Sequence, residues 1–198
     1  MNHPLVFVDI DTQHDFIDPA GSLAVPGVEA IHANLRRLTQ FAREHGIPVI
    51  ATSCAHTLDE EDPEPFPPHC LLGTKGHDRH QTTAWPGSKV VALGQPPAFE
   101  NIPAHVTLHK RHYDLFTHPH ASALFARYAG SNPVFVVYGV ATDYCVKAAV
   151  LGLRERGYRC QVVADAVRGI NPEDEEEALQ EFVNRGAVLT ITARVCQD

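Results

Sequence analysis

The sequence predicts a three-layer α/β/α fold built on a central, mostly parallel sheet. Short apolar segments rich in β-branched residues alternate along the chain with longer segments whose apolar residues recur at helical spacing. Strands that are apolar on both faces are typical of parallel sheets covered by helices on both sides. The chain has 198 residues. Because domains usually contain about 100–200 residues, we expect a single domain over residues 1–198.

The expected strands are short apolar runs between turn signals. The clearest is PVFVVYG, at Pro133–Gly139, and Ile47–Thr52 carries Pro48 at its start, where a missing N–H is tolerated. The full set is Leu5–Ile10, Ile47–Thr52, Lys89–Leu93, Val106–His109, Pro133–Gly139, Cys160–Ala164 and Val188–Thr192.

Three segments are predicted to be helices, because their apolar residues repeat every three or four positions. They are Gly27–His45, Thr142–Arg156 and Pro172–Arg185. The first two are each followed by a glycine, which is a common helix C-terminal signal. The stretch from Ser53 to His105 differs, since it is rich in proline, glycine, histidine and acidic residues. Long irregular segments are uncommon unless functional, so we interpret it as a loop-rich insertion over the carboxyl edge of the sheet.

The charge and composition of the chain exclude several classes of binding partner. The formal net charge is -8, which argues against nucleic acids and anionic membranes, because both require basic surfaces. No apolar run approaches the roughly 18 residues of a membrane span, and no signal-peptide pattern opens the chain. The five cysteines are odd in number and lack paired spacing, which favours free thiols. We therefore expect a cytoplasmic protein that acts on a small molecule.

Three reactive residues follow predicted strands: Asp11, Lys110 and Cys145. In parallel α/β sheets ligands bind beyond the carboxyl ends of the strands, so the fold brings these residues to one edge. Cys145 falls in the first turn of a helix that Thr142 is expected to cap. There the helix dipole favours a thiolate, and backbone N–H groups can hold an oxyanion.

Each of these residues also has a simpler interpretation. A lone cysteine on a helix is more often a small buried residue, and the spacing alone gives Cys145 only a modest edge as a nucleophile. Asp11 is either a general base at the end of a buried strand or a turn residue. Lys110, taken in isolation, is more typical of a solvated surface cation.

Histidines and acidic residues of the insertion suggest a metal site. His56 follows the second strand, and His69 follows the residues FPP. Imidazole is a frequent metal ligand, and a carboxylate from the loop, Asp62 or Glu64, would complete the set. The acidic run around them is otherwise a solvated loop, and the 13 histidines of the chain dilute the signal.

The combination of motifs resembles the isochorismatase-like cysteine hydrolases, and within them the nicotinamidases. The resemblance spans about Leu5 to Thr192 and rests on four motifs in a fixed order. They are VDIDTQHDF in the first strand, FPPHCLLGTKG in the insertion, KRHYDLF from Lys110, and GVATDYCV around Cys145.

This resemblance implies a catalytic triad with Cys145 as nucleophile, Asp11 as base and Lys110 as the third member. It implies a cis peptide bond between Val140 and Ala141, with the N–H groups of Ala141 and Cys145 forming the oxyanion hole. Phe16 and Phe66 match the aromatic positions that enclose the substrate ring. The implied reaction is hydrolysis of nicotinamide to nicotinate and ammonia through a thioester.

The resemblance also implies a divalent metal held by His56, His69 and an acidic loop residue, Asp62. The family pattern at the second strand is Asp-x-His, whereas this chain has Cys54-Ala-His56. A thiolate at Cys54 favours zinc, which makes zinc the expected ion. Two alternatives remain: a metal-free family member acting on another amide, ureide or carbamoyl group, and a non-catalytic binding or redox-sensing protein. We also expect a homo-oligomer.

Overall fold

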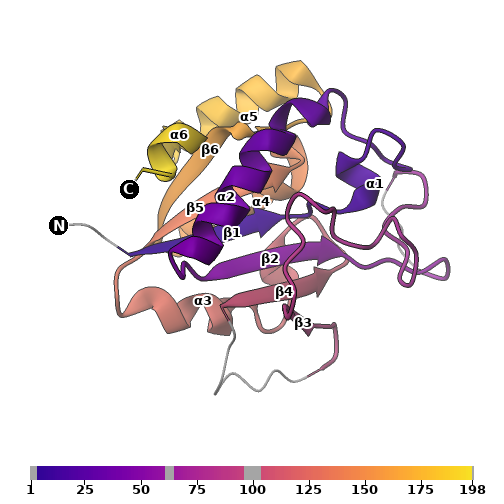
Figure 1. Ribbon diagram of the computed structural model, residues 1–198, viewed down its shortest axis with the longest axis horizontal. Coiled ribbons are helices and arrows are strands. Elements are labelled where there is room, and N and C mark those ends of the chain that lie inside the picture. The colour runs from indigo at the N-terminus through magenta and orange to yellow at the C-terminus, as the bar shows by residue number, and fades with distance from the viewer. Residues whose placement is uncertain (1–3, 61–64, 96–103, 198) are drawn as a thin grey trace.

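The structure, a computed structural model, describes residues 4–60, 65–95 and 104–197 (Figure 1). Seven strands form one sheet in the order β3-β4-β2-β1-β5-β6-β7, and every neighbouring pair is parallel. The predicted α/β class with a parallel sheet is confirmed. The strands are β1 (Leu5–Ile10), β2 (Val49–Cys54), β3 (Lys89–Val91), β4 (His105–Lys110), β5 (Val134–Val140), β6 (Arg159–Arg168) and β7 (Val188–Thr190).

Six α-helices and three shorter turns join the described strands (Figure 1). The helices are α1 (His14–Ile17), α2 (His32–Glu44), α3 (Ala121–Ala129), α4 (Lys147–Glu155), α5 (Pro172–Asn184) and α6 (Thr192–Val195). Two 3₁₀ turns cover Val28–Ile31 and Leu115–Thr117, and one π-helical turn covers Thr142–Val146. Asn171 caps α5 by accepting a hydrogen bond from the Glu173 N–H at 2.9 Å, and Pro172 begins that helix.

Two apolar layers enclose the sheet. On one face, Val6 and Val8 of β1 pack against buried residues of α3, α4 and α5. On the opposite face, Phe7 packs against α2 and α6. This alternation follows from the two-residue period of a strand, and burial on both faces explains why β1 has an almost wholly apolar sequence.

Several predicted boundaries differ from the observed ones. Strand β6 runs on to Arg168, well beyond the predicted end at Ala164, because a bulge between Val137 and Gly139 lets β5 pair with its later residues. Thr142 does not cap the helix that carries Cys145; the cap position is Ala141, and Thr142 is the first residue of the π turn. Helix α3 was not predicted from the sequence.

Glycine is required near the end of β5. Gly139 has φ of +115°, and a Cβ there would lie 2.1 Å from the carbonyl oxygen of Ile10. A side chain cannot be accommodated at that distance, so β5 can approach the end of β1 this closely only with glycine. The close approach brings the segment that follows β5 next to the residue that follows β1, Asp11.

The predicted insertion lies mainly in the long connection from β2 to β3. Within its described parts, 55–60 and 65–88, the chain forms turns rather than helices or strands. An isolated bridge between Gln13 and Arg79 joins it to the residues that follow β1, and a second, between His56 and Leu71, lies within the connection itself. This connection supplies several of the residues around the site described next.

Candidate active site

Asp11, Lys110 and Cys145 meet at the carboxyl edge of the sheet. Lys110 Nζ lies 2.8 Å from Asp11 Oδ2 and donates to Cys145 Sγ at 3.3 Å. Their exposed fractions are 0%, 1% and 7%, respectively. The simpler interpretation therefore fails for Lys110, because this lysine is buried rather than at the surface.

Backbone and neighbouring strands orient Asp11. It has φ of +48°, just after the last residue of β1. Its N–H donates to the Thr52 hydroxyl at 3.2 Å, and that hydroxyl donates in turn to Oδ1 at 2.6 Å. Thr52 belongs to β2, the neighbour of β1. Because Oδ1 is held in this way, Oδ2 is the oxygen that faces Lys110 and the thiols.

A second thiol, that of Cys54, lies inside the same cluster. Lys110 Nζ is 3.4 Å from Cys54 Sγ, which lies 3.7 Å from Asp11 Oδ2. Asp11, Cys54 and Cys145 each place a potential ligand atom within 4.8 Å of the other two. The Gln13 side chain fixes the Cys54 backbone, accepting from its N–H at 2.7 Å and donating to its carbonyl at 2.8 Å.

The pKa of the Cys145 thiol differs from the value expected from the sequence. Hydrogen bonding with Cys54, together with burial, raises the pKa of the Cys145 thiol well above its usual range, although Lys110 opposes this. The prediction that a helix N-terminus lowers this pKa is therefore wrong, because the hydrogen bond with Cys54 and the desolvation of the thiol outweigh it. Burial lowers the pKa of Lys110, but Asp11 and the two cysteines raise it more, so the lysine is a cation. Cys145 rests as a thiol and needs a base.

An apolar cavity of about 350 Å³ opens onto Cys145. Phe16 and Phe66 both line it, together with Ala141. The peptide bond between Val140 and Ala141 is cis. The lining residues are Phe16, Leu23, Val25, Cys54, Phe66, His69, Tyr113, Val140, Ala141, Tyr144, Cys145 and Ile170.

Two tyrosines of this cavity were missed by sequence reasoning. Tyr113 and Tyr144 pack edge to face, with ring centroids 5.2 Å apart, and Phe66 packs on Tyr144 at 5.5 Å. Their positions offered a signal, since Tyr144 precedes Cys145 and Tyr113 lies in the motif that begins at Lys110. Aromatic side chains therefore form a large part of the cavity wall.

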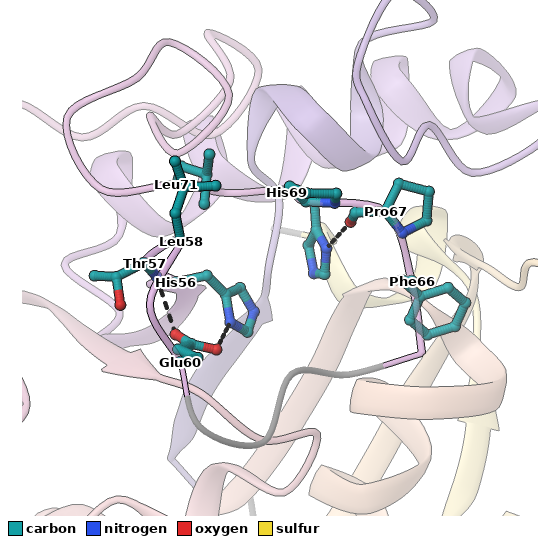
Figure 2. Close-up of a pocket in the computed structure, with 9 residues that line it drawn as sticks. His56, Thr57, Leu58, Glu60, Phe66, Pro67, His69 and Leu71 are labelled. Atoms are coloured by element: carbon teal, nitrogen blue, oxygen red, sulfur yellow. Dashed lines mark hydrogen bonds and ion pairs between the residues drawn. The ribbon is translucent and has the colours of Figure 1, made fainter.

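His56 and His69 form the described part of the predicted metal site. Their ring centroids lie 4.7 Å apart, and Figure 2 shows the two imidazoles pointing toward one another across an outer pocket of about 470 Å³. Ligand atoms of His56, His69 and Cys54 lie within 4.8 Å of one another. Asp62 and Glu64, the two candidates for an acidic ligand, lie outside the described residues.

In both imidazoles a protein oxygen contacts Nδ1 and holds the ring in place, as is usual for metal-binding histidines. His56 Nδ1 lies 2.9 Å from Glu60 Oε2, and His69 Nδ1 lies 2.9 Å from the Pro67 carbonyl (Figure 2). Burial raises the pKa of Glu60, but hydrogen bonds from His56 and Thr57 lower it more, so Glu60 accepts as a carboxylate. His56 Nε2 is buried and has no hydrogen-bond partner among the described residues. This arrangement fits a metal ion, because it presents a desolvated lone pair.

Glu60 itself was not singled out from the sequence. The signal that could have found it is its spacing, four residues after His56 within the acidic run. Its other oxygen accepts from the Thr57 N–H at 3.0 Å and lies 3.5 Å from Arg111 Nε. Both carboxylate oxygens of Glu60 are therefore engaged, one of them by His56.

Comparison with known proteins places this geometry in context. The model of the isochorismatase domain family matches residues 5–194. The chain is 27% identical to the nicotinamidase of Escherichia coli (strain K12), with 94% of each chain covered. It is 30% identical to the nicotinamidase/pyrazinamidase of Mycobacterium tuberculosis, covering 87% of this chain and 91% of the relative.

Solved structures give the same picture. The pyrazinamidase/nicotinamidase of Streptococcus mutans superimposes with a TM-score of 0.78 at 27% identity, over 94% of this chain and 99% of that one. The pyrazinamidase of Pyrococcus horikoshii, solved in complex with zinc, gives 0.75 at 27% identity, over 94% and 98%.

Proposed function

We propose, from the premise that the chain belongs to the isochorismatase family, that it hydrolyses nicotinamide to nicotinate and ammonia. The observation that carries this proposal is the buried cluster of Asp11, Lys110 and Cys145, which opens onto an aromatic cavity bordered by His69. Nicotinamidase relatives that align over nearly the whole chain support it.

In the proposed mechanism Asp11 takes the proton from the Cys145 thiol as the sulfur attacks the amide carbon. The backbone N–H groups of Ala141 and Cys145 stabilise the oxyanion of the tetrahedral intermediate. Asp11 then returns the proton to the leaving nitrogen, and ammonia departs, leaving a thioester on Cys145. Asp11 next activates a water molecule, which hydrolyses the thioester to the carboxylate and restores the thiol.

Lys110 holds the reacting groups in place during these steps. It lies between the carboxylate and the sulfur, at 2.8 Å and 3.3 Å, so it stabilises negative charge on either atom. Phe16 and Phe66 are proposed to enclose the pyridine ring, which positions the carboxamide over Cys145. Correct placement of the reacting atoms accounts for a large part of the rate of such reactions.

His56 and His69 are proposed to hold a divalent metal ion, with zinc the expected ion and Asp62 a further ligand. When bound, the ion supplies a Lewis-acid contact for the nitrogen of the pyridine ring. Cys54 either joins the ligands or lines the cavity, since its sulfur is close to both the histidines and the triad. Glu60 keeps His56 in the tautomer that binds metal through Nε2.

The test is ammonia release from nicotinamide by the parent protein, Cys145→Ala and Cys160→Ala. Cys160 is a matched control, because it is a buried cysteine of β6 away from the cavity. Cys145→Ala should lower kcat by a factor of about 10³ or more, whereas Cys160→Ala should leave it unchanged. Residual turnover by Cys145→Ala within tenfold of the parent would overturn the cysteine mechanism.

A second candidate function follows from Cys54, which stands where the family pattern has a metal-binding aspartate. It is a metal-free hydrolase for another amide, ureide or carbamoyl group. Assays on benzamide, aliphatic amides and ureides, with and without a chelator, separate the two. Preference for a substrate without a ring nitrogen, unaffected by the chelator, would favour the second candidate.

We also propose a cytoplasmic location and a homo-oligomeric state. Within residues 4–60, 65–95 and 104–197, no helix is both long enough and apolar enough to cross a membrane. Light scattering on the purified chain tests the oligomer.

A further inference from the structure

A second histidine-rich cluster lies outside the triad and the His56–His69 pair. It combines His14 and Asp18 from the two ends of α1, His32 at the start of α2, and His80 from the connection between β2 and β3 (Figure 1). Potential ligand atoms of His14, Asp18 and His80 lie within 4.8 Å of one another. The ring of His80 lies 4.9 Å from that of His14 and 5.0 Å from that of His32.

Protein oxygens already engage one nitrogen of two of these rings. His32 Nε2 donates to the Ile17 carbonyl at 2.6 Å, which leaves Nδ1 as the nitrogen with a lone pair. His80 Nδ1 lies 3.0 Å from the Thr82 hydroxyl and accepts a hydrogen bond from the Thr82 N–H at 3.3 Å. These contacts fix the orientation of the ring, as contacts to one ring nitrogen commonly do for metal-binding histidines.

The carboxylate of the cluster is oriented as well. Asp18 Oδ1 accepts a hydrogen bond from the Ala20 N–H at 3.0 Å, while Oδ2 lies 3.4 Å from His14 Nδ1. The side chains of His14 and Asp18 are 14% and 31% exposed, so an ion can reach the cluster from solvent. His80 is the buried member of the cluster and is only 4% exposed.

We propose that His14, His80 and Asp18 form a second metal site, which takes a borderline divalent ion such as Zn²⁺, Co²⁺ or Ni²⁺. Two imidazoles with one carboxylate are a donor set that these ions favour over Mg²⁺ or Ca²⁺. The ion cross-links α1 and the β2–β3 connection, two segments distant in sequence. Because α1 also carries Phe16, the bound ion stabilises one wall of the cavity.

The test uses full-length, tag-free protein, stripped with a chelator and dialysed against Zn²⁺. Bound zinc is counted by elemental analysis, and the rise in Tm on adding Zn²⁺ is measured. His80→Gln and His14→Gln remove ligands of the proposed site, His69→Ala disables the other site, and His45→Gln is an exposed control. Circular dichroism verifies that each variant is folded, and His14→Gln, at a partly exposed position, serves if His80→Gln does not fold.

His80→Gln and His14→Gln should each bind one equivalent of zinc less than the parent and lose most of the Tm rise. His45→Gln should match the parent, and His69→Ala should still bind one equivalent that the additional change His80→Gln removes. Zinc content and Tm rise equal to the parent in His14→Gln and His80→Gln would overturn the proposal. These readouts do not depend on hydrolysis of nicotinamide, so the two proposals fail separately.

Discussion

Replacing Lys110 by methionine tests how strongly the buried ion pair is integrated into the fold. Methionine keeps most of the length of the side chain but removes the charge and the donor. Lys110 Nζ lies 2.8 Å from Asp11 Oδ2 and donates to the His112 carbonyl at 3.1 Å, and the lysine is only 1% exposed. Removing one member of a buried pair leaves the other charge without compensation, which costs about 3–5 kcal/mol. We expect a loss of that size in the free energy of unfolding of Lys110→Met.

The double variant Asp11→Asn/Lys110→Met separates charge from packing. It removes both charges, so the uncompensated carboxylate disappears, and we expect at least about 2 kcal/mol of the loss to be recovered. Urea denaturation followed by circular dichroism gives each free energy, and an unchanged m value shows that the same surface is exposed on unfolding. A loss below about 1 kcal/mol for Lys110→Met would refute the reasoning, as would a double variant no more stable than the single one.

The pH dependence gives an independent check on the same pair. The pKa of Lys110 is raised in the folded state, so its contribution to stability is fully present below the unfolded value of about 10.4. It is lost only as pH rises through the higher folded value. The stability difference between the parent and Lys110→Met should therefore stay constant from pH 7 to pH 9. A difference that declines steadily over this interval would mean that the lysine is not held as a cation.

Three further predictions concern other sites. Burial lowers the pKa of His105 to about 3, so unfolding takes up a proton below pH 6.5. Between pH 7 and pH 5 the free energy of unfolding of the parent should therefore fall by about 2 kcal/mol more than that of His105→Gln. Gly139→Ala should lose about 2–3 kcal/mol in urea denaturation because its Cβ meets backbone, whereas Gly130→Ala, with open space around it, should change little. Cys54→Ala should shift the pH inflection of Cys145 alkylation by iodoacetamide downward, and an unchanged inflection would contradict the assigned cause of the raised pKa.

Much of the fold was predictable because its signals are local. Every strand of the sheet was expected, since buried parallel strands produce apolar runs with sharp ends. Helix α3 was missed, because only Ala121, Leu124 and Phe125 of its nine residues are buried and its apolar stripe is short. The extension of β6 depends on a bulge at Gly139, and such a bulge is a property of pairing between strands.

The site was predictable only in part, for a related reason. Strand ends brought Asp11 and Lys110 together as expected, because topology alone decides which residues share an edge. The roles of Cys54 and Glu60 depend on contacts across the chain, with Lys110 and with His56 respectively. The pKa of Cys145 was mispredicted because the helix terminus was considered without the hydrogen bond from Cys54 and the desolvation that burial imposes.

A raised thiol pKa is compatible with the proposed mechanism because the proton stays within one buried cluster. At rest the cluster contains one cation, Lys110, and one anion, the Asp11 carboxylate. Transfer of the Cys145 proton to Asp11 moves the negative charge from oxygen to sulfur and leaves the net charge at zero. Lys110 lies 2.8 Å from the oxygen and 3.3 Å from the sulfur, so it compensates the anion in both states. Burial penalises a thiolate formed by losing its proton to solvent, because that step leaves the cluster with an extra negative charge. Cys54, which stands where the family pattern has aspartate, is a neutral thiol and therefore adds no second anion to the cluster. The chain therefore needs Asp11, rather than a low resting pKa, to activate its nucleophile.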